Sequence, residues 1–274
     1  IPVIMAGLII AAHFSVGVNV FAISPLLGNI IHDYEISRGA AGLLIALALL
    51  VSACFGLPGG VVTTRIGLTR SYTVGWWLIG LAALSFLAPN YLSLLALRLF
   101  YGLGVALVLI ATGPMLLQWF KPKEVMIMNG LNTAVISLGI ALSVATAAPL
   151  AGVLGWQNSL SIFGAMGLLG AAAWTVLGKA PAHTAQKSSS MPIREIPRLI
   201  RNRQILLLLL ADAGVLVQYT ALTAWLPAFY TEVRGMTPTQ AGFVTGLLPF
   251  IGVFAVLVGG FLPLRFGTPR SYLI

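Results

Sequence analysis

The sequence predicts an all-α polytopic membrane protein, and three observations lead to this fold class. Of the 274 residues, 59% are hydrophobic and 8% are charged, whereas a soluble globular domain carries roughly 25% charged residues. The mean hydropathy is +1.00. Charge-free stretches recur along the chain, each long enough for the roughly 20 apolar residues that a membrane helix needs. This composition excludes disordered and collagen-like chains, and the single cysteine, Cys54, excludes an intrachain disulfide scaffold.

Charged residues divide the chain into eight predicted membrane helices. The first charge is Asp33, so the first helix begins at the N-terminus; a cleavable signal peptide is the alternative, but its apolar region would be shorter. Residues 125–178 carry no charge and are too long for one helix, so the segment 152–158 is predicted to break them. The predicted helices cover 1–28, 39–64, 71–97, 99–120 with a start near Ser93, two helices within 125–178, 204–230 and 238–262.

The basic residues predict the orientation. Twelve of the fifteen Lys and Arg residues lie in the segments 63–70, 121–124, 179–203 and 265–270. Because positive residues gather in cytoplasmic loops, we predict that these segments and the N-terminus are cytoplasmic. The same rule accounts for the net charge of +9 without a nucleic-acid partner. The expected location is the inner (plasma) membrane of a bacterium.

An internal repeat predicts the architecture. Residues 59–72 match residues 259–272 without a gap, at a Gly-Gly pair and at single Arg, Gly, Arg, Ser and Tyr positions. Both copies leave a helix for a cytoplasmic segment, so the repeats are parallel and six helices apart, as in one class of transporters. We predict an N-terminal six-helix half over 1–178, a cytoplasmic linker over 179–203, and the first two helices of a second half over 204–274. Four further helices are expected to follow.

Two motifs carry a family resemblance. The segment 60–70, with Gly60, Arg65, Gly67 and Arg70, resembles the signature between helices 2 and 3 of the major facilitator superfamily. Thr64 stands where the family pattern has an acidic residue that helps to close the cytoplasmic side. The segment 97–104, with Arg98, Gly102 and Gly104, is similar to the helix 4 signature of the family, with Tyr101 at its usual Gln position.

Three shorter segments refine the resemblance. Residues 148–152 partially match the Gly-Pro-x-x-Gly-Gly element of antiporters in the family. Residues 24–27, 40–44 and 129–132 look most like the cyanate permease branch. The resemblance implies a secondary active transporter that works by alternating access, with Gly60, Arg65, Gly67 and Arg70 as its conformational switch. A purely topogenic role for the two arginines is the alternative, because basic loops fix orientation in any case.

Catalytic chemistry is not expected. The histidines, His13, His32 and His183, are dispersed, and no Cys/His spacing suits zinc. The Gly102-Leu-Gly104 segment follows no strand, so it predicts helix packing rather than a nucleotide loop. We therefore predict no enzyme activity, no metal and no cofactor.

Polar residues within the predicted helices indicate a substrate pathway. A charge at a helix centre costs roughly 2.5–3.5 kcal/mol on insertion scales, so Arg98 marks a pathway unless it snorkels to the membrane surface. Asp212 is the one acidic residue in a predicted span, and its depth differs from that of Arg98 by roughly 10 Å, so no direct ion pair is expected. The alternative for Asp212 is a polar group that faces the cytoplasm near a helix end. The predicted pathway consists of Arg98, Tyr101, Asn19, Asn132, Asp212, Tyr219 and Thr223; for the polar residues among them, hydrogen bonds between helices are the alternative.

The predicted substrate is a small organic or inorganic anion, because an arginine can form two parallel hydrogen bonds to a planar anion. A multidrug or cationic solute exporter and a non-transporting membrane sensor of the same fold are the alternatives. For Arg98 itself, proton coupling or a structural contact with the first helix, without solute binding, is the alternative. The expected partners are the solute, a proton as candidate coupled ion and the lipid bilayer, and the expected state is a monomer. Over 193–203, apolar residues recur at three- and four-residue spacing with arginines between them. This pattern is typical of a short amphipathic helix on an anionic membrane surface.

Overall fold

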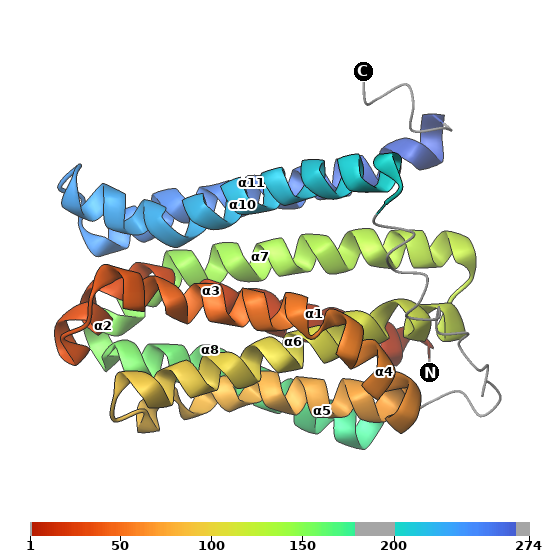
Figure 1. Ribbon diagram of the computed structural model, residues 1–274, viewed down its shortest axis with the longest axis horizontal. Coiled ribbons are helices and arrows are strands. Elements are labelled where there is room, and N and C mark those ends of the chain that lie inside the picture. Colours follow the sequence, from red (N-terminus) through yellow and green to blue (C-terminus); the bar gives the residue numbers. More distant parts are fainter. Residues whose placement is uncertain (1, 179–200, 267–274) are drawn as a thin grey trace.

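The computed structural model describes residues 2–178 and 201–266, with side chains up to residue 259, and every element in these ranges is helical. The helices lie alongside one another in an elongated bundle (Figure 1). Helix α2 (Leu27–Tyr34), which leads to the start of α3 (Arg38–Cys54), lies at the left of Figure 1, and we call this end the Arg38 end. The opposite end, where α4 (Gly56–Ile66) lies, is called the Arg65 end. The expected amphipathic segment of the linker lies outside the described residues.

The first predicted helix is divided into three elements. Helix α1 (Pro2–Val20) is followed by the 3₁₀-helix η1 (Ser24–Leu26) and by α2 (Leu27–Tyr34). Pro25 has no N–H group to donate to the carbonyl of Phe21, and the Ser24 N–H donates to that carbonyl instead, at 2.9 Å. The regular α-helix therefore ends at Val20 rather than at residue 28, whereas Pro2–Tyr34 as a whole is long and apolar enough for the predicted span.

The second predicted helix is bent. It forms α3 (Arg38–Cys54) and α4 (Gly56–Ile66), which meet at an angle of 56°. Pro58 cannot donate to the carbonyl of Cys54, and Gly56 lowers helix stability at the same point. The matching positions of the sequence repeat hold Val256 and Val258, and α11 (Pro238–Phe266) is continuous there. The bend is thus specific to the first copy of the repeat.

The third and fourth helices differ most from the prediction. Helix α5 (Leu68–Gly80) continues as the 3₁₀-helix η2 (Leu81–Leu87), and α6 (Tyr91–Trp119) starts well before residue 99. The expected helix over 71–97 is wrong because Asn90 caps α6: its side chain accepts from the Ser93 N–H at 2.9 Å, and the Ser93 hydroxyl lies 3.3 Å from the Asn90 N–H. Arg98 lies in the second turn of α6, in agreement with the expected start near Ser93.

The remaining helices agree with the sequence prediction. Helices α7 (Pro122–Leu154) and α8 (Trp156–Leu177) are separated at Gly155, which has φ +82°, so the predicted break within 125–178 is confirmed. Helix α10 (Arg203–Glu232) and α11 match the predicted spans 204–230 and 238–262. In Figure 1, α10 and α11 lie together along one side of the bundle, beside α7.

Glycines allow the helices to pack closely. A Cβ atom at Gly102 of α6 would lie 2.5 Å from the Ala48 carbonyl oxygen of α3, and one at Gly104 would lie 2.5 Å from the Gly75 oxygen of α5. A Cβ at Gly242 of α11 would lie 2.7 Å from the Val144 oxygen of α7. Small residues of this kind let membrane helices approach each other backbone to backbone.

The helices are long and apolar enough to cross a membrane. Six segments in the described ranges are long and apolar enough to span a membrane, with α1, η1 and α2 together (Pro2–Tyr34) counted as one, and α3 with α4 forms a seventh if the bent pair counts as one span. Helix α5 with η2, which corresponds to the remaining predicted span, is not among them. The chain is therefore an all-helical polytopic membrane protein.

Candidate functional site

Arg98 is buried within residues 2–178, the N-terminal part that is predicted to hold six membrane helices and is called the six-helix part below, and it binds main-chain carbonyls. Its Nε donates to the Leu44 carbonyl of α3 at 2.9 Å, its Nη1 to the Asn19 carbonyl at 2.8 Å and its Nη2 to the Val20 carbonyl at 2.8 Å. The last two carbonyls are at the C-terminal end of α1, where a helix leaves its carbonyls without helical donors. Arg98 therefore caps α1.

The capping compensates for the burial of the charge. A helix C-terminus carries about half a negative charge, and a hydrogen bond to a charged group contributes roughly 1.5–3 kcal/mol. The guanidinium carbon also lies 4.7 Å from the centre of the Tyr101 ring, within cation–π range. Among the described residues no carboxylate lies within 4.0 Å of Arg98. Asp212 is exposed on α10.

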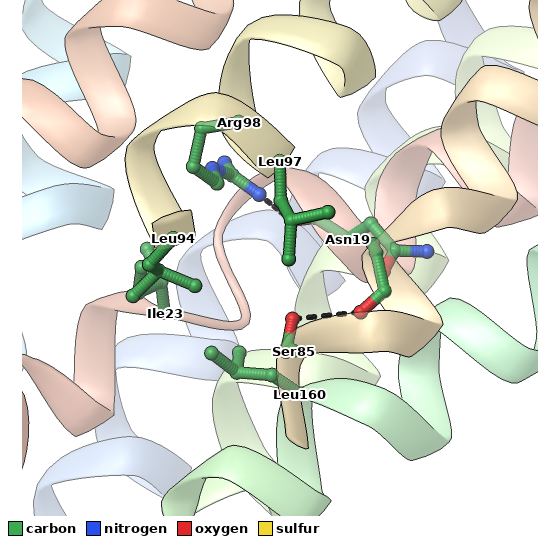
Figure 2. A pocket seen from close by; sticks show the side chains of 8 residues that line it. Asn19, Ile23, Ser85, Leu94, Leu97, Arg98 and Leu160 are labelled. Atoms are coloured by element: carbon green, nitrogen blue, oxygen red, sulfur yellow. Dashed lines mark hydrogen bonds between the residues drawn. The ribbon is translucent and has the colours of Figure 1, made fainter. Parts of the chain in front are cut away.

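A small pocket lies beside Arg98. Figure 2 shows Arg98 and Leu97 on one side of it, and Ser85 and Leu160 on the opposite side. Its volume is about 10 Å³, which is room for about one water molecule. A solute larger than water therefore does not fit next to Arg98 in this arrangement.

Two other predicted pathway residues join this cluster. The Tyr101 hydroxyl donates to the Val16 carbonyl of α1 at 2.7 Å. The Asn19 amide donates to the Ser15 carbonyl at 2.9 Å and to the Phe163 carbonyl of α8 at 3.1 Å. Arg98, Tyr101 and Asn19 thus lie together, and their polar groups hold α1 to α3, α6 and α8.

A second cluster joins α10 to the six-helix part at the Arg38 end. The Ser24 hydroxyl of η1 lies 2.8 Å from the Thr223 carbonyl and 2.6 Å from the Ala224 carbonyl. Pro227 has no N–H group, so the Thr223 carbonyl lacks its helical donor and is free to accept from Ser24.

Side chains of α3 and α10 complete this cluster. A Cβ atom at Gly42 would lie 2.9 Å from the Trp225 indole, and Arg38 pairs with Glu232 at 2.9 Å. We call these interactions, Ser24 with Thr223 and Ala224, Gly42 with Trp225, and Arg38 with Glu232, the Arg38-end contact.

The rest of α10 has a different environment. Residues 206–218 are exposed in the part of the chain that the structure describes, Asp212 among them. Tyr219 is partly buried and packs edge-on against Phe21, with ring centres 6.4 Å apart, and Thr223 is fully buried. Tyr219 and Thr223 therefore lie next to the end of α1, whereas Asp212 does not.

Six side chains hold buried polar atoms without a hydrogen-bond partner among the described residues. Tyr72, Trp76 and Trp119 lie on α5 and α6, and the other three are Asn132 on α7, at both amide atoms, Tyr219 on α10 and Thr245 on α11. Sequence reasoning missed Thr245, which follows by three residues the Gly242 that packs against α7. Buried polar groups normally have partners, so such groups are candidates for binding water or a ligand.

The predicted switch motif lies at the Arg65 end. Gly67, with φ +89°, joins α4 to α5, and Arg65 and Arg70 are exposed. The Thr63 and Ser71 hydroxyls lie 2.7 Å apart across this turn. Within the described ranges neither arginine has a carboxylate within 4.0 Å. The same ranges contain no group of three His, Cys, Asp or Glu side chains able to share a metal ion.

Comparisons with known proteins agree with this architecture. The chain is 26% identical over 240 residues to a hexuronate transporter of Bacillus subtilis, covering 84% of the chain and 57% of that protein. It is 27% identical over 245 residues to a nitrite extrusion protein of the same organism, covering 88% of the chain and 60% of that protein. The chain therefore spans less than two thirds of either relative.

A solved structure and a family comparison complete the assignment. The fold matches a bacterial homologue of the human lysosomal transporter Spinster, in an inward-facing and occupied conformation, with a TM-score of 0.73 at 20% identity. The match covers 99% of this chain and 63% of that one. The family comparison matches residues 9–274 to the Major Facilitator Superfamily. The chain belongs to the Major Facilitator Superfamily.

Proposed function

We propose that the full-length protein containing this chain is a secondary transporter that moves a small anion across the membrane by alternating access. The observation that carries the proposal is the Arg38-end contact, through which α10 meets the six-helix part at one end of the bundle. In the orientation that the basic segments predict, this contact closes the outer side of the membrane.

The Arg38-end contact consists of a few weak interactions that can break and form again. Its ion pair is exposed to solvent, and such pairs contribute about 0–1 kcal/mol. Its other parts are one hydroxyl and one indole against a glycine. Rocking of one half against the other needs a contact that can break without unfolding either part. At the opposite end, Gly60, Arg65, Gly67 and Arg70 are the proposed switch.

The anion class follows from the relatives and from the polar groups. Hexuronate and nitrite are both small anions, and each appears in the name of a protein that the chain resembles. Amide and hydroxyl groups donate hydrogen bonds to such oxygens, and Asn132, Tyr219 and Thr245 hold buried groups without a protein partner. We infer that the solute passes these groups and Thr223. Asp212 is the proposed acidic group of the pathway, with a proton as the coupled ion.

Uptake into proteoliposomes tests the proposal. The full-length protein is reconstituted, and the entry of labelled nitrite, nitrate, cyanate and glucuronate is measured against protein-free liposomes. We expect saturable uptake or counterflow of at least one anion. The anion class is wrong if none of the four is transported while a cationic dye is, and transport itself is wrong if neither class moves.

Two substitutions test the proposed solute contacts. Asn132→Ala and Tyr219→Phe each remove groups that would bind the solute, so KM should rise about two- to tenfold, as expected for the loss of 0.5–1.5 kcal/mol. The matched control is Thr133→Ala, next to Asn132, because the exposed Thr133 hydroxyl donates to the Asn129 carbonyl of its own helix. An equal change of KM in the control and in Asn132→Ala would contradict the assignment.

A further inference from the structure

We propose that Arg98 is a positioning residue, which fixes the end of α1 and thereby holds Ser24 against α10 in the Arg38-end contact. The inference rests on the proposed function, because the contact that Arg98 controls is the one that alternating access must open and close. It differs from the expectation that Arg98 binds the solute.

The path from Arg98 to Ser24 is short and buried. Arg98 holds the carbonyls of Asn19 and Val20, and Ser24 follows Val20 by four residues. Phe21, Ala22 and Ile23 between them are at most 3% exposed, and the Ser24 N–H is bonded to the Phe21 carbonyl at 2.9 Å. A segment that is closely packed and internally bonded transmits a displacement of one end to the other.

At the far end of this path, Ser24 meets a carbonyl that needs a donor. Pro227 leaves the Thr223 carbonyl without its helical N–H group, and the Ser24 hydroxyl lies 2.8 Å from it. The Ser24 hydroxyl, whose single proton is shared with the Ala224 carbonyl at 2.6 Å, is thus the donor next to this buried acceptor on α10. A shift of η1 away from α10 would leave that acceptor unpaired, which is unfavourable in a buried environment.

The three carbonyls explain why the residue is an arginine. They lie on two helices, with Leu44 on α3 and the other two on α1, and the guanidinium reaches them through three different nitrogen atoms. A lysine ammonium offers three donors from one nitrogen and cannot reproduce this spread. Because the three nitrogen atoms of the Arg98 guanidinium already donate to the protein, a planar anion would have to displace main-chain carbonyls to bind it.

Distance measurements between spin labels test the proposal in the full-length protein. Labels are attached at Asn29→Cys, on α2, and at Val233→Cys, just after α10, two exposed sites at the Arg38 end. The exposed native Cys54 is first replaced by serine. Distance distributions are recorded in lipid nanodiscs without solute for the parent, Arg98→Lys, Ser24→Ala and the double variant.

We expect a shift to longer distances in both single variants. The double variant should shift no further than the larger of the two, because residues that act through one path are not additive. The matched control is Thr112→Val on α6, whose buried hydroxyl donates to the Val108 carbonyl of its own helix at 2.8 Å; it should keep the parent distribution. If Arg98→Lys does not insert into the membrane, Arg98→Gln has the same predicted outcome.

Transport kinetics separate positioning from solute binding. A positioning role lowers kcat of Arg98→Lys and leaves KM within about twofold of the parent. The proposal is overturned if Arg98→Lys keeps the parent distances, if the shifts of the two single variants add in the double variant, or if KM rises more than about tenfold with unchanged distances. The distances are read without solute, so they remain decisive even if the protein transports no anion.

Discussion

The indole of Trp225 on α10 lies so close to Gly42 on α3 that a Cβ atom at Gly42 would be 2.9 Å from the Cζ2 atom. Heavy atoms at this distance overlap, so any side chain larger than glycine must push the indole aside. The relationship identifies Gly42 as a position where α10 is held close to α3, between the ion pair of Arg38 with Glu232 and the hydrogen bond of Ser24 with Thr223.

A substitution at Gly42 should therefore open the Arg38-end contact. We expect Gly42→Val to move the label pair at Asn29 and Val233 to longer distances. The control is Gly39→Ala on the same helix, where an added Cβ would come no closer than 3.8 Å to any atom. Unchanged distances in Gly42→Val would show that Trp225 yields without moving α10.

The ion pair of Arg38 with Glu232 should stabilise the closed Arg38-end contact only slightly, and this stabilisation should depend on the signs of the two charges. Both side chains are exposed, and such pairs contribute about 0.2–1 kcal/mol, which corresponds to at most about fivefold in an equilibrium. We expect Arg38→Glu to favour the open state by a factor in this range at low salt, and the exchange Arg38→Glu with Glu232→Arg to restore the closed state. Failure of the exchange to restore it would mean that the charges do not interact.

The close approach of α6 to α3 should limit the side chain at Gly102. Gly102→Ala places a Cβ 2.5 Å from the Ala48 carbonyl oxygen, and such overpacking typically costs about 1–3 kcal/mol. The matched control is Gly113→Ala in the same helix, where nothing lies within 4 Å and the higher helix propensity of alanine should stabilise slightly. Thermal unfolding in detergent should give a lower Tm for Gly102→Ala than for Gly113→Ala, and the reverse order would contradict the packing.

The arginines of the switch motif should affect the rate of transport rather than affinity. Arg65 and Arg70 are exposed at the Arg65 end, away from the polar groups proposed to bind the solute. We expect Arg65→Gln with Arg70→Gln to lower kcat about tenfold, equivalent to about 1.4 kcal/mol, with KM and membrane topology nearly unchanged. Normal turnover in this double variant would leave the arginines with a topogenic role alone.

The sequence predicted the membrane helices more successfully than their ends. The break at Gly155 was visible because a glycine and polar residues interrupt a long apolar stretch. The expected start of the fourth helix near Ser93 agrees with Tyr91, whereas the expected end of the third helix at residue 97 is wrong because the Asn90 cap begins α6 before it. Predicting the bend between Cys54 and Gly56 requires recognising that Pro58 removes one helical hydrogen bond.

The candidate site was less accessible to sequence reasoning. Composition singled out Arg98 as a buried charge, but its partners are carbonyls of Leu44, Asn19 and Val20. Main-chain acceptors occur at every residue, so no pattern of side chains marks the ones that an arginine will bind. Ser24 and Thr245 were missed as site residues for a related reason, because a lone hydroxyl in an apolar helix more often bonds within its own helix.

Cross-linking the Arg38-end contact tests the central claim most directly. In the full-length protein with Cys54→Ser, cysteines at Arg38 and Glu232 are joined by a short, cleavable bifunctional thiol reagent, and anion uptake is measured before joining, after it and after cleavage. The two single-cysteine variants serve as controls for modification alone. We predict that uptake stops when the contact is locked and returns when the link is cleaved. Undiminished uptake by fully cross-linked protein would contradict the claim that this contact opens during transport.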